Sequence, residues 1–190
     1  MPHFRFSLRA SVRAAAALAV ATGLAAPALA AKAPKTKPTG VVKLLALNDF
    51  HGQLESPGSF RANIDSPLLP AGGADYAARA IAAARAVNPN TVVVAAGDLI
   101  GASPLVSAFF HDEPPIEAMN RAGLDFNAVG NHEFDDGKDE LLRMQRGGCH
   151  PTDTVYSCRG AEVGTPVPFE GAKFKFLAAN VVRKSSGKTL

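Results

Sequence analysis

Short apolar runs alternate with helical segments along most of this chain, and this alternation constrains its fold more than any other feature. The apolar runs predict strands at residues 41–47, 91–96, 125–129 and 174–178. The intervening segments predict helices at residues 72–87, 105–110, from the Pro114–Pro115 break to about 121, and 136–146. Strands that alternate with helices form parallel sheets, so the sequence predicts an α/β domain whose polar turns lie at the carboxyl ends of the strands.

The first 30 residues have the features of a secretory signal peptide. Three arginines and no acidic residue precede an apolar run at 14–26, and Ala28-Leu29-Ala30 forms a small-residue cleavage site. An uncleaved N-terminal anchor is the alternative, although the run is short for a membrane span. We therefore expect a signal peptide at 1–30, a flexible linker at 31–40 and one domain at 41–190, in a protein exported to the periplasm or the medium.

The charge balance changes when the leader is set aside. The chain carries 20 basic and 17 acidic residues, and three of the basic ones are the leader arginines. The exported part therefore has no net charge, and the chain has no Trp. A nucleic-acid binder would need a basic surface with aromatic residues, so we expect neither a nucleic-acid partner nor, after cleavage, a membrane partner.

Two cysteines, Cys149 and Cys158, both lie in the exported part. Export to an oxidising compartment predicts a disulfide between them. A zinc thiolate pair is the alternative, but the close Cys-x-x-Cys spacing of zinc sites is missing.

Three predicted strands are followed by turns that contain typical metal-ligand residues. These turns are 48–52 (Asn-Asp-Phe-His-Gly), 97–98 (Gly-Asp) and 130–135 (Gly-Asn-His-Glu-Phe-Asp). Residues two apart in an extended chain point the same way, so Asp49 and His51 can bind one ion. Each turn alone is weak evidence, but carboxylates and imidazoles at successive strand ends are typical of a two-metal hydrolase.

These blocks resemble the D-x-H, G-D and G-N-H-E motifs of the calcineurin-like metallophosphoesterases. The wider forms at 49–54, 97–104, 131–135 and 177–181 resemble the branch of exported 5'-nucleotidases and 2',3'-cyclic-nucleotide phosphodiesterases. The likeness runs from about residue 41 to the end. It implies the N-terminal part of a β-sandwich flanked by helices, in α/β/β/α layers.

The resemblance also implies a role for each residue of the site. Asp49 and His51 would bind a first divalent ion, Asp98 would bridge two ions, and Asn131 would bind the second. His132 would face the phosphoryl group, where it stabilises the transition state or protonates the leaving oxygen, and Asp135 would orient it. The implied reaction is in-line attack on a nucleotide phosphate by a hydroxide that bridges the ions, and Zn, Mn, Co, Fe and Ni suit the ligands equally well.

The chain departs from the family pattern in its supply of ligands. The family completes its site with a Gly-His turn and a Gly-His-x-His turn, and neither occurs in these 190 residues. Of the remaining histidines, His111 and His150 are not expected to replace them. We therefore expect a truncated catalytic domain that is inactive alone and lacks a C-terminal region.

Several functions remain open at this stage. Cyclic-nucleotide, nucleotide-sugar or sulfur-ester hydrolysis could take place at the same site, and a non-catalytic exported fragment is a further alternative.

Overall fold

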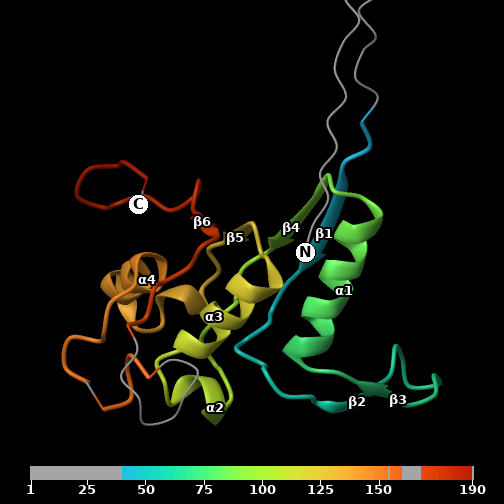
Figure 1. Ribbon diagram of the computed structural model, residues 1–190. Helices are drawn as coiled ribbons and strands as arrows, with labels where there is room; N and C mark the ends of the chain where they lie inside the picture. Colours follow the sequence, from blue (N-terminus) through green and yellow to red (C-terminus); the bar gives the residue numbers. More distant parts are fainter. Residues whose placement is uncertain (1–39, 154, 160–167, 190) are drawn as a thin grey trace, which may run out of the picture. The chain divides into compact units, whose positions relative to one another are not determined.

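Four parallel strands form the central sheet in the spatial order β1-β4-β5-β6 (Figure 1). The computed structural model describes residues 40–153, 155–159 and 168–189. The strands are β1 Lys43–Leu47, β4 Thr91–Ala95, β5 Phe126–Ala128 and β6 Lys175–Leu177. The predicted α/β class is confirmed, whereas the expected signal peptide and linker, apart from Gly40, lie outside the described residues.

The strand register places all the carboxyl ends at one edge of the sheet. Leu47 lies opposite Ala95, Ala95 opposite Asn127, and Ala128 opposite Leu177. The polar turns that follow β1, β4 and β5 are consequently neighbours in space.

The helices fall where the sequence predicts them, with shorter limits in places. They are α1 Ala74–Val87, α2 Leu105–Ala108, α3 Glu113–Ala122, the 3-10 turn η1 His132–Phe134, and α4 Gly137–Arg146. Helix α3 starts with Pro114 and Pro115 in its first turn, where the missing amide hydrogens cost nothing, and it ends at Gly123 with φ +82°.

One face of the sheet forms the core with the helices. Its fully buried side chains include Val93 of β4, Ile116 and Met119 of α3, and Met144 of α4. Helices α1 and α3 lie side by side over this face (Figure 1). Burial on this face stabilises the domain, because each fully buried side chain of this size contributes roughly 1.5–3 kcal/mol.

The opposite face of the sheet is open in the described part of the chain. Leu44 is 64% exposed and Leu177 is 52% exposed, and Phe126 is exposed as well. Their strand neighbours Leu45 and Phe176 pack against the core. The central sheet thus has helices on one side in the described part of the chain, and no second sheet covers its other face there.

A small antiparallel hairpin, which the sequence analysis missed, connects β1 to α1. It pairs β2 Gly58–Phe60 with β3 Leu69–Ala71. Its strands are largely exposed, and one contains Pro70. The sequence therefore lacks the alternation of apolar and polar residues that would predict these strands.

The predicted disulfide between Cys149 and Cys158 is confirmed. It closes a loop that packs on the buried Glu113 of α3. The Ser157 hydroxyl donates to Glu113 Oε1 at 2.5 Å, and the Cys158 amide donates to Glu113 Oε2 at 2.8 Å. Within the described ranges, no helix has the length and apolar character to cross a bilayer.

Candidate metal centre

Backbone hydrogen bonds join the turn after β1 to the turn after β4. The amide of Asp49 donates to the carbonyl of Gly97 at 3.3 Å, and the amide of His51 donates to the carbonyl of Asp98 at 3.0 Å. The two turns are therefore held together as a continuation of the β1–β4 pairing.

Both turns adopt a backbone conformation that L-residues rarely take. Asp49, His51 and Asp98 have φ values of +49°, +45° and +50°. Such residues cost of order 1–3 kcal/mol each and cluster at functional sites. The turn after β5 approaches closely because Gly130 has no side chain: a Cβ there would overlap the carboxylate of Asp98.

His51, Asp98 and His132 meet at this edge of the sheet. One ligand atom from each lies within 4.8 Å of the other two, and all three side chains are partly buried. The rings of His51 and His132 lie edge to face with centroids 5.0 Å apart. Asp49 is at the rim, with Oδ1 4.0 Å from His51 Nε2.

The carbonyl of Gly101 orients His51. It lies 2.8 Å from His51 Nδ1 and can only accept, so Nδ1 carries the proton and Nε2 keeps a free lone pair toward the cluster. Gly101 is itself held by Asp112, whose Oδ2 accepts from the Gly101 amide at 3.0 Å. The sequence analysis missed Gly101 and Asp112, since neither falls in a pattern that indicates metal binding.

Glu133 links the turn after β4 to the turn after β5 through hydrogen bonds. Its buried carboxylate accepts hydrogen bonds from the amides of Asp98 at 3.0 Å, Leu99 at 2.8 Å and Gly130 at 2.6 Å, and from the Asn127 side chain at 3.2 Å. A buried carboxylate without a cation needs such donors to offset its desolvation. Glu133 points away from the cluster and supports it.

His132 and Asp135 form a pair at the mouth of the cluster. His132 Nδ1 lies 2.7 Å from Asp135 Oδ2, the contact expected from the sequence. This hydrogen bond with Asp135 raises the pKa of His132, because the carboxylate stabilises the imidazolium.

The structure brings together most of the residues singled out from the sequence. Asp49, His51, Asp98, His132 and Asp135 line one site. Asn131 precedes His132 in the same turn, with an exposed side chain. His111 and His150 group with Glu140 instead.

The donor set fits divalent ions. The Nε2 lone pair of His51, the carboxylates of Asp49 and Asp98, and the amide oxygen of Asn131 offer mixed nitrogen and oxygen ligands. Asp98 Oδ1 accepts from the His132 amide at 3.1 Å, which leaves Oδ2 available. Mixed imidazole and carboxylate sets suit Zn, Mn, Fe, Co and Ni.

Comparisons with known proteins find partial similarity to phosphoesterases. No family model matches it. It is 47% identical over 164 residues to an uncharacterized protein in the pqq-V 5' region of Acinetobacter calcoaceticus, covering 83% of this chain and 78% of that protein. It is 39% identical over 101 residues to a probable 5'-nucleotidase of Treponema pallidum, covering 52% of this chain and 16% of that protein. Among solved structures, the calcineurin-like phosphoesterase YfkN of Bacillus subtilis is 26% identical with a TM-score of 0.48, covering 77% of this chain and 39% of that one.

The chain is thus similar to a probable 5'-nucleotidase and to a calcineurin-like phosphoesterase, in each case over part of their length. It spans most of the Acinetobacter protein but 16% of the Treponema protein.

Proposed function

We propose that this chain is part of an exported, metal-dependent hydrolase that releases phosphate from nucleotides. The observation that carries the proposal is the meeting of His51, Asp98 and His132, from three separate strand ends, within 4.8 Å. The parallel strands bring the three turns together, and each turn contributes a side chain of a metal-binding type.

In this proposal each side chain has a distinct task. Asp49 and His51 hold a first ion, Asp98 holds both, and Asn131 holds the second. When bound, the two ions supply Lewis-acid chemistry, polarising the phosphoryl group and acidifying water for in-line attack. No side chain has to act as a nucleophile.

His132 is the proposed proton donor. Its pKa is raised by the hydrogen bond with Asp135, so that more of the imidazolium persists toward neutral pH. A protonated ring next to the site can donate to the leaving oxygen, and Asp135 keeps Nδ1 occupied so that Nε2 faces the substrate.

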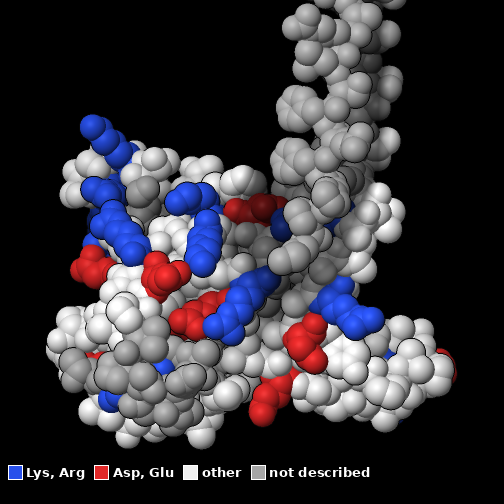
Figure 2. All heavy atoms as spheres, viewed as in Figure 1, with Lys and Arg blue, Asp and Glu red and all other residues white. Residues whose placement is uncertain are grey.

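The proposed substrate is a small nucleotide rather than a nucleic acid. On the face shown in Figure 2, acidic side chains lie among the basic ones, which do not form one continuous basic patch. The Treponema relative bears the name of a 5'-nucleotidase, which supports the same substrate class.

The 190-residue segment alone is proposed to be inactive. Two ions need about ten coordination positions between them. Asp49, His51, Asp98 and Asn131 cover only some of these, and the downstream histidine turns of the superfamily are not in this sequence. Activity is proposed for this segment in combination with those histidine turns.

The test is phosphate release from 5'-nucleotides, 2',3'-cyclic nucleotides and nucleotide sugars by a protein that carries this segment together with those histidine turns. We expect turnover that is lost with EDTA and restored by Mn²⁺ or Zn²⁺. His132→Asn should lower kcat by at least about 100-fold, the usual size of a general acid–base contribution. Asp98→Asn should abolish turnover, because it removes the carboxylate that would hold both ions. Glu170→Gln, a change at an exposed carboxylate, is the matched control. Full activity in the Asp98→Asn variant would rule out the proposal.

A further inference from the structure

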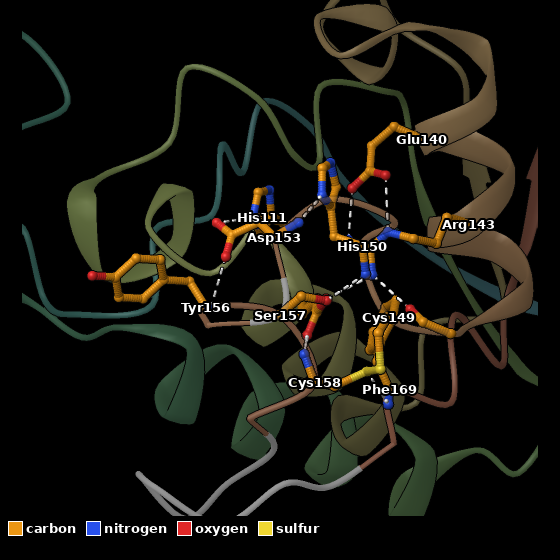
Figure 3. Close-up of polar contacts among 12 residues, drawn as sticks. His111, Glu140, Arg143, Cys149, His150, Asp153, Tyr156, Ser157, Cys158 and Phe169 are labelled. Atoms are coloured by element: carbon orange, nitrogen blue, oxygen red, sulfur yellow. Dashed lines mark hydrogen bonds and ion pairs between the residues drawn. A yellow bond between two sulfur atoms is a disulfide. The ribbon is translucent and has the colours of Figure 1, made fainter.

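A second group of possible metal ligands shares no residue with the centre described above. His111 follows α2, Glu140 belongs to α4, and His150 lies in the disulfide loop (Figure 3). One ligand atom of each lies within 4.8 Å of the other two, and all three residues are partly buried. Nothing in the proposed phosphoesterase reaction uses these side chains.

His111 is already arranged as a metal ligand. Its Nε2 lies 3.0 Å from Asp153 Oδ2, and both side chains are partly buried. Because Asp153 accepts, Nε2 carries the proton and Nδ1 keeps its lone pair. A carboxylate behind an imidazole is the arrangement that orients histidine ligands in metalloproteins.

The backbone on either side of His150 is fixed. Its neighbour Cys149 is bonded to Cys158, and the His150 amide donates to the Ser157 hydroxyl at 2.7 Å. The loop therefore holds the Cα of His150 beside His111, with little ordering left to do when a ligand binds.

The two rings are stacked, with centroids 4.3 Å apart and planes 10° apart. One ion cannot lie in the planes of two parallel rings, so binding requires one ring to turn. His150 is the ring able to turn, because its Nδ1 contacts only residues of its own loop: the backbone amide of Asp153 at 3.1 Å, and the amide and the hydroxyl of Thr152, both at 3.4 Å. When the His150 ring turns, Nδ1 gives up these hydrogen bonds and can bind the ion, while the proton stays on Nε2.

Glu140 is held in place by Arg143. Arg143 Nε donates to one carboxylate oxygen at 2.8 Å, and Arg143 Nη2 donates to the other at 2.6 Å. Each oxygen retains a second lone pair for an ion. The guanidinium charge nearby weakens binding of any cation, so affinity has to come from the imidazoles.

We propose that His111, His150 and Glu140 form a second site for a divalent ion of the Zn²⁺ class. Two imidazoles and one carboxylate match the ligands of Zn²⁺ sites that keep an open position. Mg²⁺ and Ca²⁺ prefer oxygen ligands and are disfavoured here. The bound ion links the disulfide loop to α4 and to the α2–α3 junction.

The experiment counts Zn²⁺ bound per chain by equilibrium dialysis, which works whatever the association state. The full chain carries His51→Asn and Asp98→Asn, so that the first centre does not contribute. We expect one ion per chain in this background and none after adding His150→Asn or His111→Asn. Glu170→Gln, added to the same background, should leave the ion bound, and excess Mg²⁺ should not displace it.

The folded state of the variants is checked independently. An Asn at position 150 can still accept the Asp153 amide, so His150→Asn should keep the disulfide and the thermal transition of its parent. Zn²⁺ should raise the melting temperature of the parent background and leave that of the His150→Asn variant unchanged. A parent background that binds no Zn²⁺, or a folded His150→Asn variant that still binds it, would overturn the proposal. Because the first centre is disabled throughout, neither result depends on the phosphoesterase activity.

Discussion

Glu133 shows how much of the candidate centre depends on a residue that binds no substrate. Its carboxylate receives hydrogen bonds from both the β4 turn and the β5 turn, and the residue is 2% exposed. The turns carry left-handed backbone at Asp98, which would relax if the bonds were lost. Glu133 therefore determines the position of Asp98 without contacting the reaction.

Replacing Glu133 with Gln tests this role. The amide group presents N–H where an acceptor is needed, so at least one buried backbone amide loses its partner. Each such loss costs about 1–3 kcal/mol, so we expect the free energy of unfolding to fall by roughly that amount. Urea denaturation of the parent and the variant measures it. Glu170→Gln, at an exposed position, should have no effect, and an unchanged unfolding midpoint in Glu133→Gln would contradict the assigned role.

The pair of His132 and Asp135 predicts a pH effect. The pKa of His132 is raised in the folded state. The pair therefore stabilises the folded state fully at pH values below the pKa of an unfolded histidine, and this stabilisation is lost as the pH rises through the pKa of His132 in the folded state. In Asp135→Asn, the pKa of His132 should fall toward the ordinary imidazole value.

NMR titration of the His132 ring measures that change in the metal-free chain. Asp136→Asn removes a neighbouring carboxylate that the pKa shift does not depend on, and serves as the control. An identical His132 titration in the parent and in Asp135→Asn would show that the hydrogen bond does not cause the shift.

At the scale of elements, α4 is tied to α3 by one arginine. Arg143 donates to Glu113 Oε1 at 2.6 Å and to Glu140, and its guanidinium lies 5.3 Å from the centre of the Phe169 ring. The side chains of Arg143 and Glu113 are both almost fully buried. Removing one partner of such a pair leaves an uncompensated buried charge.

Arg143→Met keeps the apolar stem and removes the charge. We expect it to lower the free energy of unfolding by about 3–5 kcal/mol, the usual cost of breaking a buried ion pair. Urea unfolding without reductant is the measurement. Arg121→Met is the control, because the Arg121 side chain is 70% exposed and 3.9 Å from Glu117. Equal effects of the two changes would argue against a special role for Arg143.

The elements with a strong hydrophobic period could be predicted from the sequence. Helices α1 and α4 and strands β1 and β4 lie within two residues of their predicted limits. The hairpin of β2 and β3 could not be predicted, because its exposed residues bury no face. The short helix α2 was predicted two residues too long; it is also held by a long-range contact, the bond from the Ser107 hydroxyl to the Gly52 carbonyl at 2.6 Å, which has no sequence signature.

The position of the candidate site could be predicted from the parallel arrangement of the strands. Parallel strands bring their carboxyl ends together, so Asp49, Asp98 and His132 had to be neighbours once the strand order was known. The supporting contacts of Asp112 and Gly101 each pair one side chain with a backbone group of another segment, and no spacing of residue types in the sequence indicates them.

On the scale of the whole molecule, the open face of the sheet determines behaviour in solution. Leu44, Phe126 and Leu177 form an exposed apolar surface on the side of the sheet away from the helices, and β1 and β6 are its edge strands among the described residues. Large exposed apolar patches and free strand edges drive association. The isolated chain should therefore associate with itself or aggregate.

Leu44→Lys with Leu177→Lys should reduce that association without disturbing the core, since both side chains point away from it. Size-exclusion chromatography with light scattering measures the mass. Tyr76→Lys changes an exposed residue of α1 instead and should leave the association unchanged. A parent chain that is monomeric and melts cooperatively would contradict the prediction.

The cystine at Cys149 and Cys158 has a consequence for when the protein can mature. Ser157 and Cys158 donate two of the hydrogen bonds that stabilise the buried Glu113 carboxylate. The disulfide keeps their segment in place. In a reducing compartment the disulfide would not hold this segment against α3. Glu113 would then lose the hydrogen bonds from Ser157 and Cys158 and keep its ion pair with Arg143. Oxidation is therefore a folding step for this corner of the molecule, and chains held under reducing conditions should remain sensitive to proteases there until the thiols join.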